Sequence, residues 1–134
     1  MRRNAELSNV SVLKIDKDCF VHNEWTQDLV RLALFVCKWH GIKVISIRMT
    51  ETRKGLHFYI HITPAVQPEL ANRLQFLMGD DARRVDFNRA RIRSGLNEWN
   101  LLFERANVRL RIIHHASKLR PQHSKQRAEV MSYA

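Results

Sequence analysis

Two neighbouring stretches decide the fold: Lys43–Met49, which reads KVISIRM, and Leu56–Ile62, which reads LHFYIHI. Both are rich in β-branched and aromatic residues, and the turn-like segment 50–55 between them predicts an antiparallel hairpin. Side chains alternate along a strand, so each stretch has an apolar face and a more polar one. The predicted core face holds Ile45, Ile47, Met49, Leu56, Phe58, Ile60 and Ile62. The opposite face holds Val44, Ser46, Arg48, His57, Tyr59 and His61.

The flanking sequence predicts further strands and helices around this hairpin. Segment 9–15 is predicted as the first strand and segment 108–113 as the last. Between the first strand and the hairpin, an apolar stripe predicts a helix that begins at the N-cap Asn23 and ends at Gly41. Its members are Trp25, Leu29, Leu32, Ala33, Val36 and Cys37. Further helices are predicted over 68–78 and 82–93, ended by Gly79 and Gly95, with a short fourth helix around Trp99.

This order of elements indicates the fold class. A β-α-β-β-α(αα)-β order predicts an α+β protein with a ferredoxin-like (split βαβ) antiparallel sheet. The helices are expected on one face of the sheet, with extra helices before the last strand.

Size and composition predict a single domain. The chain has 134 residues, of which 45% are hydrophobic. We expect a flexible N-terminus over 1–8, one α+β domain over 9–113 and a basic, flexible tail over 114–134. No apolar run approaches the ~20 residues that cross a bilayer, and no secretory signal is recognised. The two cysteines, Cys19 and Cys37, are too few for a disulfide framework, so we expect a cytoplasmic protein without a membrane partner.

Charge is the strongest indication of function. Lys and Arg number 23 against 13 Asp and Glu, which gives a net charge of +10 and a pI of about 10.4. A single domain this basic is typical of proteins that bind a polyanion. The prediction is a protein that binds RNA or DNA mainly through backbone phosphates.

The polar face of the hairpin is the first candidate binding surface. Rings on a sheet can stack on unpaired bases, and cationic side chains can pair with phosphates. Its candidates are Arg48, His57, Tyr59 and His61, with Arg53 and Lys54 at the hairpin tip. The stretch 54–61 resembles the central motif of RNA-recognition-motif domains, but its exposed rings are one residue out of phase, so the resemblance bears only on architecture. The same face could instead pack on the extra helices or on a second subunit.

An arginine cluster over 82–93 is the second candidate surface. It consists of Arg83, Arg84, Arg89, Arg91 and Arg93. On a helix, Arg84 and Arg91 form one stripe and Arg89 and Arg93 another, and guanidinium groups suit phosphate contacts. Alternatively, nearby Asp80, Asp81 and Asp86 neutralise part of the cluster. Residues 74–103, which include this cluster, resemble a stretch of small uncharacterised proteins from phages, plasmids and archaeal viruses. That resemblance implies a mobile-element setting and no activity.

No pattern in the chain carries a strong catalytic signature. Asp16 and Asp18 at a strand end leave open a small Mg²⁺-dependent nuclease as an alternative. His57 and His61, four residues apart on a strand, are about 13 Å apart and cannot share a metal ion. No cofactor or metal is therefore expected. A structural or adaptor subunit of a nucleoprotein assembly, including a homo-oligomer, is a further alternative.

Overall fold

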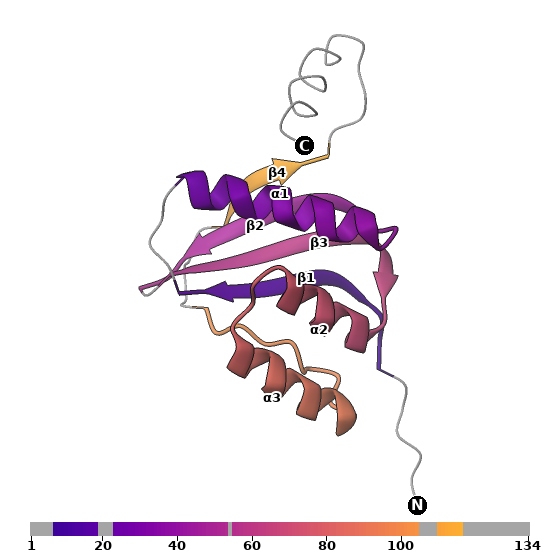
Figure 1. Cartoon of the computed structure of the whole chain (residues 1–134). Helices are drawn as coiled ribbons and strands as arrows, with labels where there is room; N and C mark the ends of the chain where they lie inside the picture. The colour runs from indigo at the N-terminus through magenta and orange to yellow at the C-terminus, as the bar shows by residue number, and fades with distance from the viewer. Residues whose placement is uncertain (1–6, 19–22, 54, 105–109, 117–134) are drawn as a thin grey trace, which may run out of the picture.

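The fold is built on a four-stranded antiparallel sheet. The computed structural model describes residues 7–18, 23–53, 55–104 and 110–116. The strands are β1 (Val10–Lys17), β2 (Lys43–Glu51), β3 (Leu56–Val66) and β4 (Arg111–His115), in the order β1-β3-β2-β4 (Figure 1). Each neighbouring pair is antiparallel. The predicted α+β class with an antiparallel sheet is confirmed, and the β2–β3 hairpin lies at the centre of that sheet.

The position of the last strand differs from the prediction. A ferredoxin-like sheet would place it beside β1, whereas β4 pairs with β2 at the opposite edge. The ferredoxin-like order is therefore not confirmed. The physical reason lies at the edge of β1 that faces away from β3, where side chains already accept hydrogen bonds from two backbone amides. The Lys14 amide donates to Gln75 Oε1 at 3.0 Å and the Asp16 amide donates to Asp80 Oδ1 at 2.9 Å. A strand could not pair there without displacing them.

The last strand also ends later than expected. It runs from Arg111 through His115, and the Ala116 amide donates to the Ile45 carbonyl at 2.7 Å. His114 and His115 therefore belong to the sheet, whereas the sequence placed them at the start of a tail. Residues 1–6 and 117–134, which hold most of the two predicted flexible ends, lie outside the described residues, as do residues 105–109 before β4.

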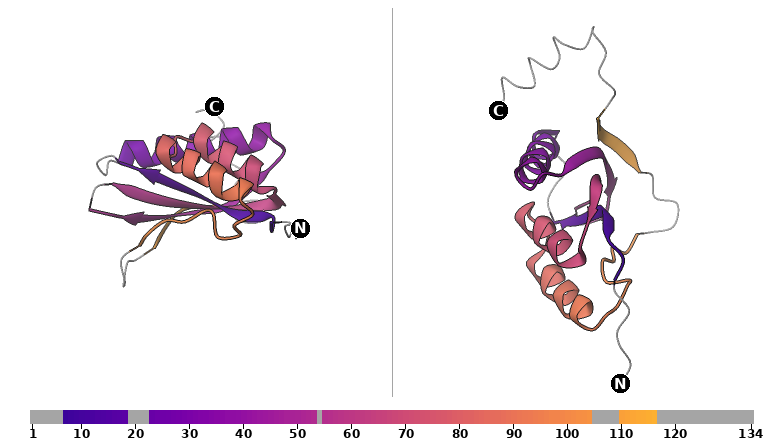
Figure 2. Two further views of the ribbon diagram at one scale, coloured as in Figure 1. Left: turned by 90° about the horizontal axis from the view of Figure 1, so that it is seen from below. Right: turned by 90° about the vertical axis from the view of Figure 1, so that its right-hand side faces the viewer.

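Three helices accompany the sheet: α1 (Asn23–Trp39), α2 (Pro68–Leu77) and α3 (Ala82–Arg93). Figures 1 and 2 show α1 and α2 on one face of the sheet, with α3 packed against α2 beyond β1. The three helix spans agree with the prediction within two residues, and the glycines predicted to end them have positive φ angles. None of the described helices has the length and apolar character that crossing a membrane requires.

The predicted fourth helix is wrong. Residues 94–104 form no helix and run to the face of the sheet opposite α1 and α2 (Figure 2). We call this segment the strap. Its polar side chains bond to distant parts of the chain instead of capping a helix: the predicted N-cap, Asn97, accepts from the Ser8 amide at 3.2 Å. Trp99, only 2% exposed, anchors the strap in the core.

The core face of the hairpin matches the prediction except at Ile45. Residues Ile47, Met49, Leu56, Phe58, Ile60 and Ile62 are all buried. Ile45 is 39% exposed, and Val44 is buried in its place. A β-bulge between Val44 and Ser46 shifts the register of β2 against β3. Before the bulge the even-numbered Val44 therefore points into the core, whereas after it the odd-numbered Ile47 and Met49 do.

Helix α1 buries only part of its predicted apolar stripe. Leu29, Ala33, Val36 and Cys37 are buried as predicted, whereas Trp25 and Leu32 lie at the surface. Burial raises the pKa of the Cys37 thiol to about 11, so this cysteine remains a protonated, small apolar side chain at neutral pH.

Candidate nucleic-acid interface

The face of the sheet opposite the helices is partly covered by the strap. Strand pairing places Asp16 and Thr50 on either side of His57. Glu104, at the end of the strap, reaches this group from outside the sheet. Its Oε2 accepts from the Thr50 hydroxyl at 2.8 Å, lies 2.8 Å from His57 Nδ1 and also accepts from the Tyr59 hydroxyl. One carboxylate oxygen therefore ties the strap to β2 and β3.

His57 is held between two carboxylates. Its Nε2 lies 3.5 Å from Asp16 Oδ1, opposite the contact of Nδ1 with Glu104. Burial raises the pKa of Asp16, and the neighbouring His57 partly offsets that rise. Burial also tends to raise the pKa of Glu104, but hydrogen bonds from Tyr59, His57 and Thr50 bring it below its ordinary value. Both nitrogens of the imidazole thus face carboxylates, and His57 is only 7% exposed.

This geometry corrects the predicted role of the open face. His57 was expected to contact bases, but neither of its ring nitrogens is available to a ligand. The Tyr59 hydroxyl likewise donates to Glu104. Burial, and to a smaller extent this hydrogen bond, raises the pKa of Tyr59. Arg48 remains exposed and His61 half-buried; burial and then the Arg48 charge lower the pKa of His61. Arg53 is exposed at the hairpin tip, whereas Lys54 lies outside the described residues.

The arginine cluster divides into structural and exposed members, and Arg84 is structural. Its Nη1 donates to Asp80 Oδ2 at 2.5 Å, its Nη2 to Asn100 Oδ1 at 2.7 Å and its Nε to the Leu101 carbonyl at 3.2 Å. The side chain of Arg84 is 10% exposed and that of Asp80 is fully buried. Arg84 therefore joins α3 to the strap and does not present its charge to a phosphate, contrary to the prediction.

The other members of the cluster lie nearer to solvent. The Arg91 guanidinium lies over the Phe87 ring, 5.7 Å from its centroid. Arg83 is exposed at the first turn of α3. Of the two predicted arginine stripes, the one formed by Arg89 and Arg93 is exposed along its whole length. Of the aspartates predicted to neutralise part of the cluster, Asp80 does so by pairing with Arg84. Asp81 instead caps α3 by accepting from the Arg83 amide at 2.8 Å.

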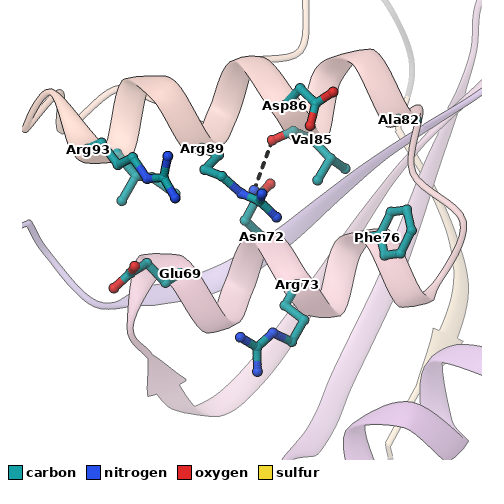
Figure 3. A pocket seen from close by; sticks show the side chains of 10 residues that line it. Glu69, Asn72, Arg73, Phe76, Ala82, Val85, Asp86, Arg89 and Arg93 are labelled. Atoms are coloured by element: carbon teal, nitrogen blue, oxygen red, sulfur yellow. Dashed lines mark hydrogen bonds between the residues drawn. The ribbon is translucent and has the colours of Figure 1, made fainter.

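Arg89 and Arg93 line a groove between α2 and α3 with a volume of about 390 Å³ (Figure 3). Its lining residues are Glu69, Asn72, Arg73 and Phe76 from α2, and Ala82, Val85, Asp86, Arg89, Ile92 and Arg93 from α3. The Asn72 amide donates to the Val85 carbonyl at 3.0 Å and joins the two helices at its floor. The guanidinium groups of Arg73, Arg89 and Arg93 make no ion pair or hydrogen bond with any residue in the described ranges.

No family model, curated protein or solved structure matches this chain. The resemblance of residues 74–103 to proteins of mobile elements therefore stays an expectation.

The alternative of a metal-dependent nuclease gains no geometric support. Asp16 lies against His57, and Asp18 is exposed beyond the end of β1. Within the described ranges, no three His, Cys, Asp or Glu side chains are grouped so that they could hold a metal ion.

Four residues at these sites escaped the sequence analysis. Glu69, Arg73 and Phe76 follow one another at steps of four and three, which places Arg73 and Phe76 on one side of α2. That spacing could have joined Arg73 and Phe76 to the arginine stripe. Glu104 carried no comparable signal, because its partners lie 45 to 54 residues away in sequence.

Proposed function

We propose that this protein binds a nucleic-acid backbone in the groove between α2 and α3. Arg73, Arg89 and Arg93 contact successive phosphates, and the ring of Phe76, which is 53% exposed, gives an unpaired base a surface on which to stack. The observation that carries the proposal is that three arginines from two helices, none of them paired within the described residues, line one groove.

The balance of charge supports this choice of ligand. Together α2 and α3 carry six arginines against Glu69 and Asp86. Only Arg84 among the six pairs with a carboxylate of a described residue. Free guanidinium groups in a groove attract a phosphate chain at long range and bind it in a bidentate manner at short range.

The fold keeps the groove in place for this role. Asp81 caps α3, the Asn72 amide bridges the two helices, and Arg84 fastens α3 to the strap. The arginines therefore stand on a rigid support, and binding orders only their side chains. Arg48 on the sheet, Arg53 at the hairpin tip, and Arg83 and Arg91 on α3 add positive potential outside the groove.

Fluorescence anisotropy with matched single-stranded RNA, single-stranded DNA and duplex DNA, measured across a salt series, tests the proposal. Each phosphate contact contributes about −0.7 to the slope of log K against log salt for single strands and about −0.9 for duplex DNA. The double variant Arg89→Ala/Arg93→Ala should therefore make the slope shallower by about 1.4 to 1.8. Phe76→Ala should weaken binding of single strands about tenfold or more and leave duplex binding little changed.

The matched control removes two positive charges elsewhere. Lys43 and Arg111 are exposed on β2 and β4, so Lys43→Ala/Arg111→Ala lowers the net charge equally. The proposal requires the control to retain more affinity and a steeper slope than the groove variant. Equal losses in the two variants would show diffuse attraction without a groove site. Absence of binding at low salt would overturn the function itself.

A further inference from the structure

Helix α1 has two apolar sides, and only one of them packs on the protein. The inner side rests on β2, with α2 and β4 at its flanks. The outer side carries Trp25, Leu32, Phe35 and Trp39, which are 59%, 38%, 64% and 77% exposed. No other described helix or strand lies against that outer side (Figures 1 and 2). We call these four residues the α1 seam.

The seam is large for a solvent-exposed surface. From side-chain areas of about 150–250 Å² and the exposed fractions above, its apolar area is on the order of 500 Å². A patch of this size is at the upper end of what monomeric proteins expose, and such patches are often interaction surfaces. Phe35 and Trp39 stack with ring centroids 6.0 Å apart, so part of the patch is ordered before anything binds.

The spacing of the seam indicates a second helix. Trp25, Leu32 and Trp39 are seven residues apart, and Phe35 follows Leu32 by three, which is the a/d pattern of helices that pack along a common line. The remaining d position holds Asp28. Its carboxylate pairs with Arg31 at 3.5 Å, so it does not bring an unpaired charge to the seam.

The same spacing is symmetric about Leu32, because Trp25 and Trp39 lie seven residues before and after it. We propose that a second copy of this chain packs its α1 antiparallel to the first, with Leu32 of both copies at the two-fold axis. Trp25 of each copy then meets Trp39 of the other, which makes the surface self-complementary. Two such seams bury on the order of 1,000 Å², about the minimum area expected of a biological interface.

The dimer has a salt dependence of its own. Each copy carries a net charge of +10, so the copies repel one another and added salt screens that repulsion. Self-association through the seam therefore strengthens with salt, whereas binding of nucleic acid weakens with salt. The two activities are thus distinguishable, and dimerisation is measured without nucleic acid.

Sedimentation equilibrium of the full chain tests the proposal. The mass should rise with concentration from 15.9 kDa to twice that value, and the transition should move to lower concentration between 50 and 500 mM salt. Leu32→Glu places two like charges at the two-fold axis and should weaken the dimer about 100-fold or more. The control is Leu77→Glu on α2, because Leu77 is 45% exposed outside the seam. Circular dichroism and Tm verify that both variants fold.

Disulfide trapping tests the antiparallel arrangement directly. The axes of packed helices lie about 8–10 Å apart, and each Cα atom lies about 2.3 Å from its own axis. Two facing copies of residue 32 at the two-fold axis are therefore within disulfide distance. In a Cys19→Ser background, with Cys37 buried, Leu32→Cys should cross-link into a dimer on mild oxidation. Phe87→Cys, at a site on α3 that is 62% exposed, should remain monomeric. A wild-type chain that stays monomeric at all concentrations would overturn the proposal, and so would a dimer that Leu32→Glu leaves intact.

Discussion

Replacing Arg84 by alanine separates a structural role from a ligand-binding one. The sequence alone would place Arg84 beside Arg91 in a phosphate-binding stripe. In the structure its guanidinium neutralises the fully buried carboxylate of Asp80 and binds Asn100 and the Leu101 carbonyl of the strap. The variant should therefore lose stability before it loses binding.

The magnitude follows from the burial of Asp80. Removing one partner of a buried ion pair costs about 3–5 kcal/mol, because the other charge is left without compensation. Asp80 is bound on its second oxygen by the amides of Asp16 and Asp81, both at 2.9 Å, and so cannot turn toward solvent without breaking those bonds. We expect the free energy of unfolding to fall by about 3–5 kcal/mol at pH 7.

The loss should depend on pH with a definite sign. Burial already raises the pKa of Asp80, and Arg84 counteracts that rise. Without Arg84 the pKa rises further, so the folded variant takes up a proton at a pH where the unfolded chain does not. The loss in free energy of unfolding relative to wild type is therefore smallest near pH 4, and it grows as the pH rises through the new pKa of Asp80.

Urea denaturation at pH 4 and pH 7, followed by circular dichroism, measures both effects. Arg89→Ala is the matched control, because Arg89 is exposed and has no described ion-pair partner; it should change stability by no more than about 0.5 kcal/mol. Adding Asp80→Asn to Arg84→Ala removes the unpaired charge, keeps an acceptor for the two amides and should recover part of the loss. A cost for Arg84→Ala below about 1 kcal/mol, equal to the control, would refute the reasoning.

Three further measurements test other parts of the structure. Gln75→Leu leaves the Lys14 amide without its acceptor at a fully buried site and should cost about 1–3 kcal/mol in urea denaturation; an unchanged midpoint would contradict this. Glu104 has a lowered pKa, so its contribution to stability is present above its ordinary value near 4.5 and is lost as the pH falls below it. Glu104→Gln should accordingly flatten the acid side of the stability profile, and a profile of wild-type shape would count against the proposed anchoring. Val44→Ala should cost about 2 kcal/mol and Ile45→Ala clearly less, because the bulge buries only Val44; the reverse order would place the bulge elsewhere.

Local patterns were sufficient to predict most of the secondary structure. Alternation in the hairpin and the glycines after the helices depend only on neighbouring residues, and the structure confirms both. The bulge at Ile45 could not be read from the strand itself, because Val44 and Ile45 are both suited to a core position. Which of them turns inward depends on the register against Ile62 and His61 of β3.

The candidate site depended on contacts that spacing does not encode. Arg84 and Arg91 lie on the same side of a helical projection, and what distinguishes them is that Arg84 meets the buried Asp80 and the strap. In the same way, His57 was predicted to be exposed because Glu104 could not be placed over it. Net charge led to the proposed class of ligand, but only packing showed which arginines have no partner among the described residues.

The occupied edge of β1 also determines how this sheet can grow. Gln75 and Asp80 hold the amides of Lys14 and Asp16 in β1, so an incoming β-strand from another molecule must break these two bonds before it can pair there. β4 lies at the opposite edge, and no described strand pairs with its outer side. Strand addition to the folded domain, including the first step of aggregation, is therefore favoured at β4, where Arg111 at its start places a positive charge.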